Sequence, residues 1–572
     1  MADDSPNLAT TVDGPQSPLA LEDAKAQRQL QAVLFALVTL GYVDGSFDPR
    51  ERRLVEETIG ELVEGWLGRF AELGSLTPEA LGSLRRSYRQ QLFEVLGSID
   101  QSLARLMATE VGVEDERERF ISSRLMLGCF EALTFLSEKE RQALLGFVDR
   151  LIAADGVVHS SELRFREALV SNLLRRPAPR TPPVERPFHF SVEREPLPID
   201  APFEPPLLAE VERPFPSGGR ALRKAAEADI RLMLRAQKAL LRLRDGSWGR
   251  LDSAPNVEAL VGQEPFVDTL VHVFPPSERR RTDYIVVGDL HGCYGSLKAV
   301  LAQTDFFGRV ARFRRDPAAH PDVKLILLGD YLDRGLWSFE GVLRLVLTLF
   351  VEFPEHVIPL VGNHEWLVEQ GPAIRSSVMP ADAVERWTPH LPKEYFQTAK
   401  TLFDQLGSVV LIDRIVVVHG GVPRQEVIER WHGLSGFNDA MVRFQMSWSD
   451  PVMLAEVSAE MQASTQRFAF GMDQFQSFMD ALGARVMIRG HEKAPEGFKA
   501  EYDDGRYRLF TVFSAGGFNN RDLPEHLDYR RLHPSFLVLS EREGRFVANP
   551  VRIAWERFND PSSNRYLEVL GT

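Results

Sequence analysis

The sequence has little cysteine, no long apolar run and no basic leader. Each absence excludes a class of protein. Only Cys129 and Cys293 occur in 572 residues, and they lie in different regions, so we expect no disulfide framework and a reducing compartment. The longest apolar stretch, around residues 30–43, is too short and too mixed to span a bilayer. The first residues are acidic and polar, unlike a signal peptide. We therefore expect a cytoplasmic protein with no transmembrane segment, beginning with a disordered tail over residues 1–20.

An excess of basic charge is missing as well. The net charge is −14 and the sequence pI is about 5.5, which argues against a general affinity for nucleic acid. The composition is that of a globular protein, and 572 residues are too many for one core. We expect two or three domains.

Three apolar, β-branched runs each end in polar residues placed around glycine. They read YIVVGDLHG from Tyr284, VKLILLGDYLDRG from Val323 and VIPLVGNHE from Val357. Such runs are typical of buried strands that deliver the next side chains to one end of a sheet. The polar residues are Asp289, His291, Asp330, Asp333, Arg334, Asn363, His364 and Glu365. Carboxylates, imidazoles and an amide at successive strand ends predict a site for divalent first-row metals.

The same blocks resemble the signature motifs of the phosphoprotein phosphatase family of metallophosphoesterases. GDLHG, GDYLDRG and GNHE are joined by later motifs: HGG at 419–421, WSDP at 448–451, RGH at 489–491 and FSA at 513–515. The resemblance covers about half the chain, and GDLHGCY is similar to bacterial and phage members and to diadenosine tetraphosphatases. It implies an α/β sandwich of two mixed sheets flanked by helices.

The resemblance also implies roles for residues of these motifs. One metal would take Asp289, His291 and Asp330, and the other would take Asp330, Asn363, His419 and His491. Two divalent ions, Mn²⁺ in the first place and Fe or Zn as alternatives, would bridge a hydroxide that attacks phosphorus directly. His364 would be the general acid, Asp333 would hold its imidazole, and Arg334 would bind phosphate oxygens with Asn363.

Two positions depart from the family pattern. Alignment on Phe470-Gly471 leaves Thr465 near the place of a second phosphate-binding arginine, so Arg467 is the candidate for that role. After FSA the chain continues Gly516-Gly517-Phe518, and the tyrosine that usually overhangs the metals is absent from that position. The shape of the substrate and the sensitivity to the natural toxins that inhibit the family are therefore open.

Residues 21–176 have a helical pattern and contain two similar Asp-Gly turns, at 40–55 and 152–167. These turns resemble the two halves of TerB-like (tellurite-resistance) helical domains, which implies an all-α domain that receives a protein partner. The candidate acids are Asp44, Asp48, Glu51, Asp155 and Glu162. They either gather around a cation or form turns and helix caps, and capping is the simpler interpretation. Asp48, Pro49 and Glu51 have the spacing of a capping box.

The segment 177–218 carries proline every few residues, so we expect a plain spacer without regular helix or central strand rather than an SH3-type ligand. The catalytic domain, 219–572, should begin with a basic amphipathic helix over 219–245. Its expected apolar face is Leu222, Ile230, Met233, Leu234, Leu240 and Leu241. The helix could lie on an anionic membrane or hold an acidic partner, but we expect it to dock on its own protein.

These features predict a metal-dependent phosphomonoesterase for phosphoserine and phosphothreonine in proteins, with the helical domain as a signalling module. WSDP and FSA favour this interpretation. The alternative is a diadenosine tetraphosphate or other nucleotide hydrolase, for which the acid pair of Asp333 and His364 is less needed. A non-catalytic scaffold that binds phosphoproteins is a third hypothesis, which the complete ligand set disfavours.

Overall fold

The computed structural model describes part of the chain, and this part divides into two compact units. The first unit is Pro182–Pro451 with Gln474–Thr572, and the second is Asp3–Thr181 with Val452–Asp473. The described residues are 33–34, 36–41, 47–72, 78–109, 133, 138–154, 162, 166, 169, 186–199, 203–370, 373–455, 457, 462 and 467–571.

The part of the second unit before residue 182 is mainly helical in its described residues, as expected. Its long helices are α2 (Pro49–Glu72), α3 (Pro78–Thr109) and α5 (Glu138–Ile152). One buried cluster joins these helices to the segment at 452–473, with side chains such as Val55, Leu96, Val148, Leu454 and Val457. The core of this unit is therefore built from two distant parts of the sequence.

The start of α2 confirms the expected capping box. The Asp48 carboxylate accepts a bond from the Arg50 amide at 2.7 Å, and the Asp48 amide donates to the Glu51 carboxylate at 2.9 Å. Glu51 thus acts as a cap. Residues 1–20, Asp44 and Asp155 lie outside the described residues, so the disordered tail and the cation hypothesis stay predictions.

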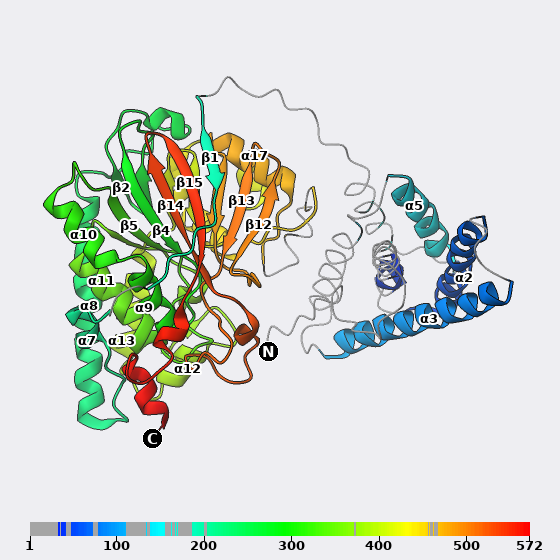
Figure 1. Ribbon diagram of the computed structural model, residues 1–572, viewed down its shortest axis with the longest axis horizontal. Coiled ribbons are helices and arrows are strands. Elements are labelled where there is room, and N and C mark those ends of the chain that lie inside the picture. The colour runs from blue at the N-terminus through cyan, green and yellow to red at the C-terminus, as the bar shows by residue number, and fades with distance from the viewer. Residues whose placement is uncertain are drawn as a thin grey trace. The chain divides into compact units, whose positions relative to one another are not determined.

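Two mixed β-sheets form the centre of the first unit, as the resemblance implies (Figure 1). The six-stranded sheet has the order β1 (His189–Val192), β15 (Arg545–Arg552), β14 (Ser535–Arg542), β4 (Arg281–Val287), β5 (Asp322–Leu327) and β6 (Val357–Pro359). The seven-stranded sheet has the order β12 (Phe498–Asp503), β13 (Arg508–Val512), β11 (Val486–Arg489), β10 (Ile415–Val418), β9 (Val409–Ile412), β3 (Val271–Phe274) and β2 (Phe266–Asp268). A separate hairpin pairs β7 (Leu367–Gln370) with β8 (Ala373–Ser376).

Alternation along β4 explains how the six-stranded sheet is covered on both faces. Ile285 and Val287 belong to the cluster shared with the helices, while Tyr284 and Val286 belong to the cluster shared with the other sheet. Successive side chains of a strand point to opposite faces, so an unbroken apolar run is what a doubly covered strand requires. The site-bearing strands are therefore held from both sides.

Helices pack on the outer face of the six-stranded sheet (Figure 1). They are α8 (Gly219–Arg244), α9 (Tyr294–Gln303), α10 (Phe306–Arg315), the π-helical turn η2 (Ser338–Leu343), α11 (Arg344–Glu352) and α13 (Lys393–Gln405). Shorter elements complete the unit: α7 (Pro206–Val211), η1 (Val257–Leu260), η3 (Asn363–Glu365), α12 (Asp382–Trp387), α14 (Gln425–Glu429), η4 (Leu434–Asn438), α15 (Ala440–Trp448), α17 (Met472–Leu482), η5 (Asp528–Arg531), η6 (Trp555–Phe558) and η7 (Arg565–Gly571). None of the described helices is long and apolar enough to cross a bilayer.

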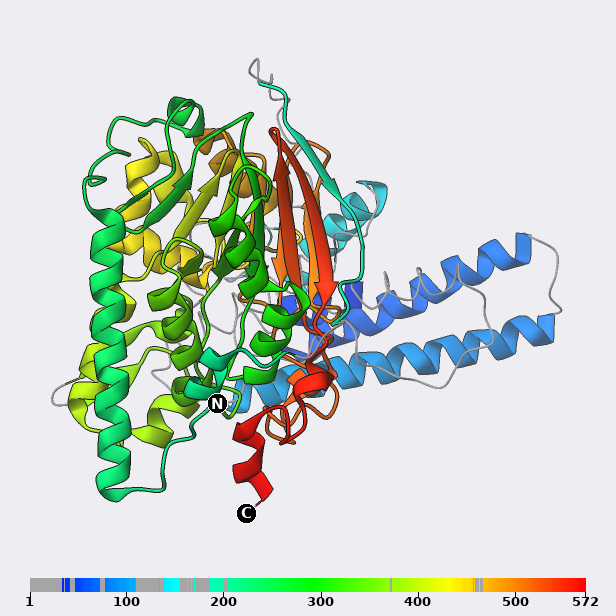
Figure 2. The same ribbon diagram turned by 60° about the vertical axis from the view of Figure 1, so that its left-hand side comes forward.

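The expectation of a plain spacer without regular helix for 177–218 is wrong at α7, and β1 and α7 both pack on the first unit. β1 adds a parallel edge strand to β15, and the two run side by side in Figures 1 and 2. The rings of Phe188 and Phe190 pack against Phe546 and Phe510, which lie in different sheets. Further along, α7 buries Leu208. Proline is tolerated here because β1 is an edge strand and Pro206 opens α7.

The basic helix forms over Gly219–Arg244, close to the predicted range, and it docks on its own unit, where it contacts α11 and α13. Leu222, Ile230, Met233 and Leu240 are buried as expected. Leu234 and Leu241 were also expected on the buried face, and this is wrong, because they are 45% and 54% exposed. They lie on the flank of the apolar stripe, and the covering elements do not reach that far.

Candidate metal centre

Five parallel strand ends meet at the candidate site. β4, β5 and β6 are parallel neighbours in one sheet, and β10 and β11 are parallel neighbours in the other. Parallel strands present their carboxyl ends at the same edge, and polar side chains there converge. The residues that follow these strands are Asp289, His291, Asp330, Asn363, His364, His419 and His491. All seven are buried.

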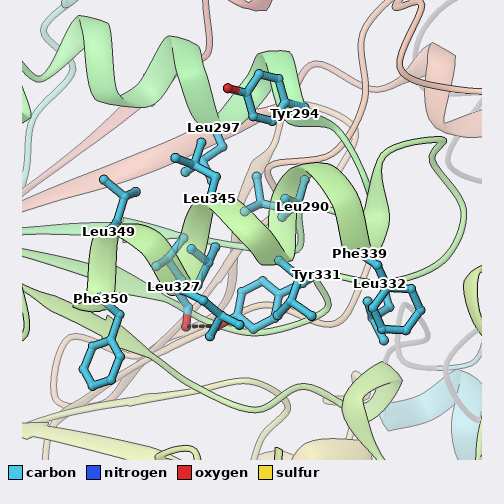
Figure 3. Packing of buried hydrophobic residues seen from close by; sticks show 14 of the residues in the cluster. Leu290, Tyr294, Leu297, Leu327, Tyr331, Leu332, Phe339, Leu345, Leu349 and Phe350 are labelled. Carbon is cyan, nitrogen blue, oxygen red and sulfur yellow. Dashed lines mark hydrogen bonds between the residues drawn. The ribbon is translucent and has the colours of Figure 1, made fainter. Parts of the chain in front are cut away.

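Apolar residues between the polar ones anchor each loop. Leu290, Tyr331 and Leu332 point into the helix-covered core, where Figure 3 shows them among Tyr294, Phe339 and other buried side chains. The Tyr331 hydroxyl donates to the Leu327 carbonyl at 3.3 Å. GDLHG and GDYLDRG thus combine side chains for the site with side chains for the core.

Asp330 is the centre of the cluster. Its Oδ2 lies 3.5 Å from Nε2 of His291 and 3.8 Å from Nε2 of His364, while its Oδ1 lies 3.3 Å from Nε2 of His419. Two groups of possible ligand atoms share it: His291, Asp330 and His364, and Asp330, His419 and His491. Within each group the atoms lie within 4.8 Å of one another, which suits a divalent ion.

Backbone carbonyls orient two of the histidines. Nδ1 of His291 lies 2.9 Å from the Leu332 carbonyl, and Nδ1 of His419 lies 3.0 Å from the Leu328 carbonyl. A carbonyl can only accept, so each Nδ1 carries the proton and each Nε2 presents its lone pair to the cluster. Both rings are therefore held in the tautomer that binds metal through Nε2.

Two oxygen atoms show that the donor set fits cations. Oδ2 of Asp289 is buried with no hydrogen-bond partner, while Oδ1 accepts from the His491 amide at 2.8 Å. Oδ1 of Asn363 lies about 3.0–3.1 Å from Asp330, His419 Nε2 and His491 Nδ1, all of which offer lone pairs. A cation between these atoms removes the repulsion, whereas without one the amide must turn and donate.

The electrostatics of the Asp289 and Asp330 carboxylates also favour a cation site. Burial raises the pKa of Asp289 to about 7, and burial together with the charge of Asp289 raises the pKa of Asp330. Ionising two neighbouring buried acids costs free energy unless a positive charge lies between them. The residues therefore fit a pair of divalent cations.

The backbone is strained where the site requires it. His291, Asp330, Asp333, Arg334 and His491 have φ values between 43° and 72°, in the left-handed region. They are five of the ten described non-glycine residues with positive φ. Such conformations cost about 1–3 kcal/mol each and cluster where function demands them.

Two motif glycines allow the ligands to approach. A Cβ on Gly362 would lie 2.2 Å from Oδ1 of Asp330, and a Cβ on Gly490 would lie 2.4 Å from Oδ1 of Asp289. Any side chain would displace a ligand oxygen at either position. The glycines of GNHE and RGH are thus a steric requirement of the cluster.

Beside the cluster, Nδ1 of His364 lies 2.7 Å from Oδ2 of Asp333, and Nε2 faces Asp330. The other Asp333 oxygen accepts from the Ala383 amide at 2.7 Å. Burial raises the pKa of Asp333 to about 6, against the opposing effects of that amide bond and Arg334. The imidazole is therefore held with a proton on Nδ1 and with Nε2 directed at the site.

Arg334 is anchored close by. Its Nη1 donates to the Pro380 carbonyl at 2.9 Å and lies 3.5 Å from the Asp382 carboxylate. Burial raises the pKa of the Tyr529 phenol against the opposing charge of Arg334, and the Tyr529 ring lies 5.5 Å from that of His291. A tyrosine from η5 thus covers the site although none follows FSA, which no local sequence signal would have revealed.

Sequence reasoning counted Glu365 among the polar residues of the site, but it gave no specific role to Glu365 or to Asp450 of WSDP. The Glu365 carboxylate accepts from the amides of Asp330, Tyr331 and Gly362 at 2.8–2.9 Å, and so fixes two ligand loops. Asp450 of WSDP lies 3.5 Å from Nε2 of His491 and accepts from Arg489 at 2.8 Å. Their place inside GNHE and WSDP was the signal that could have found them.

Arg467 is exposed and belongs to the 452–473 segment of the second unit, so its phosphate-binding role stays a prediction. Cys293 is fully buried, and burial raises the pKa of its thiol. A buried, protonated thiol is no nucleophile, which agrees with a reaction that does not pass through a phosphoenzyme.

Comparison with known proteins agrees with this geometry. Residues 283–495 match the family model described as calcineurin-like phosphoesterase. The chain contains a metallophosphoesterase domain. The matched range starts inside β4 and ends just after the RGH motif, so it holds every residue of the metal cluster.

Curated relatives of the phosphoesterase domain are similar at low identity. A serine/threonine-protein phosphatase of Caenorhabditis elegans is 27% identical over 237 residues, which are 40% of this chain and 46% of the relative. The serine/threonine-protein phosphatase PP1-delta of the same organism is 26% identical over 292 residues, 48% of this chain and 85% of the relative. The chain spans about half the length of the first of these relatives.

Among solved structures, a protein serine/threonine phosphatase from Saccharomyces cerevisiae with similarity to human phosphatase PP5 aligns with a TM-score of 0.35 and 17% identity. The alignment covers 57% of this chain and 89% of the yeast one.

Proposed function

We propose that this protein is a metal-dependent phosphomonoesterase that hydrolyses phosphoserine and phosphothreonine in proteins. The observation that carries the proposal is the His364–Asp333 pair, at 2.7 Å, directed at the carboxylate shared by both ligand groups. The names of the two curated relatives, both serine/threonine-protein phosphatases, support the same substrate class.

Six residues would hold the cofactor. Asp289, His291 and Asp330 would bind one divalent ion, and Asp330, Asn363, His419 and His491 would bind the other, with Mn²⁺ as the first choice. When bound, such a pair polarises the phosphate group and lowers the pKa of the attacking water. His364 lies in the same group of possible ligand atoms as His291 and Asp330.

His364 supplies the proton that the leaving alkoxide needs. A serine or threonine alkoxide is a poor leaving group, and general acids of this kind contribute about 10²–10⁴-fold in rate. Asp333 keeps the Nδ1 proton in place, so the second proton sits on Nε2 and faces the substrate. Arg334, held by Pro380 and Asp382, offers a planar fork to phosphate oxygens.

The alternative substrate class is a dinucleotide such as diadenosine tetraphosphate, favoured by the resemblance of GDLHGCY. Phosphate anhydrides leave as stable anions, so their hydrolysis depends less on a protonated histidine. The retained His364–Asp333 pair favours the alkyl phosphate.

The test compares phosphate release from a phosphothreonine peptide with hydrolysis of diadenosine tetraphosphate, both with Mn²⁺. We expect peptide turnover that is abolished in Asp330→Asn and reduced in His364→Ala. Turnover of the dinucleotide alone would replace the protein substrate with a nucleotide. Turnover of neither by a folded, Mn²⁺-binding protein would support the phosphoprotein-binding scaffold.

A further inference from the structure

The outward side of α8 is a continuous basic surface. Its exposed cations are Arg220, Arg223, Lys224, Arg231, Arg235, Lys238 and Arg242. At 1.5 Å per residue the 26-residue helix is about 39 Å long. Figures 1 and 2 show it along the outer side of the first unit for its whole length. A protein of net charge −14 thus presents one long positive stripe.

This charge is largely uncompensated. Among the described residues, Arg235 is the one cation of the seven in an ion pair, at 3.0 Å from Glu352. Glu227 is the single acid on the exposed side of the helix, because Asp229 is buried against Arg344. Like charges at this density repel unless an anionic partner lies over them.

Large apolar side chains project from the same face of the helix as these cations. Leu234 and Leu241 are 45% and 54% exposed and lie seven residues apart, which is two helical turns or about 10 Å. Just beyond the end of the helix, Trp248 is 58% exposed. The opposite face of α8 is fixed in the core by Leu222, Ile230, Met233 and Leu240. The helix is therefore a rigid support for both the cations and the leucines.

We propose that α8 binds an anionic lipid surface and lays this side of the first unit on a membrane. Cations in a row would approach the headgroups, while Leu234 and Leu241 would enter the interface. The leucines distinguish this partner from an acidic protein segment or nucleic acid, which cations alone would satisfy. The inference is independent of the proposed enzymatic activity.

The test is flotation of the full chain with vesicles of phosphatidylcholine, with and without phosphatidylserine. We expect binding only to the mixed vesicles and a decrease at high salt. Each cation near such a surface is worth about a factor of five in affinity, so Arg231→Glu/Lys238→Glu/Arg242→Glu should lower it about 100-fold or more. Leu234→Ser/Leu241→Ser should also lower binding, although its net charge is unchanged.

A matched control changes charge elsewhere. Arg279, Arg430 and Arg545 are exposed in the first unit outside α8, and their replacement by Glu alters the net charge equally. That variant should still bind far more tightly than the α8 charge variant. Unchanged hydrolysis of p-nitrophenyl phosphate, or an unchanged melting temperature, confirms folding of each variant.

Three results would overturn the proposal. One is no binding to the mixed vesicles, and another is equal loss in the control variant. The third is loss in the α8 charge variant with full binding by the leucine variant. If the third result is found and the wild-type protein is also retained on immobilised polyglutamate, the cations of α8 would be assigned to an acidic protein partner instead.

Discussion

Oδ1 of Asp450 lies 3.5 Å from Nε2 of His491, and this carboxylate is itself held by Arg489 at 2.8 Å. A carboxylate facing one ring nitrogen keeps the proton there and leaves the other nitrogen for metal. Here Nδ1 of His491 is the atom that lies beside the Asn363 amide. Asp450 of WSDP therefore lies beside the ring nitrogen opposite the one that faces Asn363, on a histidine that follows β11.

Replacing this orienting group should weaken metal binding rather than abolish the fold. We expect Asp450→Asn to lower the affinity for Mn²⁺ by about 10–100-fold, measured by titration calorimetry on metal-free protein. Saturating Mn²⁺ should restore most of the phosphatase rate. Asp503→Asn, which alters an exposed acid paired with Arg508, is the control and should bind Mn²⁺ normally. Wild-type affinity in Asp450→Asn would show that the contact is only structural.

The Asp333–His364 pair predicts a dependence on the leaving group. In Asp333→Asn the imidazole loses the partner that holds its Nδ1 proton, so turnover of a phosphothreonine peptide should fall about 100-fold or more. Hydrolysis of p-nitrophenyl phosphate should fall much less, since nitrophenolate leaves without a proton. Rates for the two substrates at saturating Mn²⁺ check this. Equal losses for both substrates would assign Asp333 to holding the loop through Ala383.

The gathering of these polar residues at one edge of the sheets could be predicted because each follows an apolar run inside a short motif, whereas the role of each as a metal ligand stays a prediction. The local pattern predicts both the strand and the polar residue at its end. The parallel strands of the two sheets then bring these residues together. The capping box at Asp48 was predictable for the same reason, since its partners lie within four residues.

Features that depend on distant chain segments could not be predicted. β1 forms because it pairs with the edge of β15, which lies about 350 residues later in the chain. Tyr529 reaches Arg334 and His291 only through the fold of a long loop. Leu234 has the right helical period for burial, but whether a neighbour covers it is a tertiary property.

The proline-rich segment should contribute to the stability of the phosphoesterase unit. Leu208 of α7 is 2% exposed and packs in the main core, so Leu208→Ala should cost about 2–5 kcal/mol of unfolding free energy. Glu210→Ala changes an exposed residue of the same helix and should stay within about 0.5 kcal/mol of wild type. Urea denaturation followed by tryptophan fluorescence reports this unit, which holds seven of the eight tryptophans. Equal stabilities of the two variants would restore the spacer interpretation.

A buried histidine outside the site predicts how stability changes with pH. His272 on β3 is buried, its Nε2 has no hydrogen-bond partner, and burial together with Arg244 lowers its pKa from 6.5 to about 3. Between these values the unfolded chain binds a proton that the folded chain does not. Stability must therefore fall as the pH falls through this window, by about 2 kcal/mol at pH 5.

Other acids and bases titrate in the same range, so the measurement is a difference between variants. His272→Gln removes the ionisable group, and its unfolding free energy should decline less than that of wild type from pH 7 to pH 5, by about 2 kcal/mol. His526→Gln, at an exposed position, should follow the wild-type curve. Parallel curves for wild type and His272→Gln would mean that water or a local rearrangement lets the buried imidazole take up its proton in the folded protein.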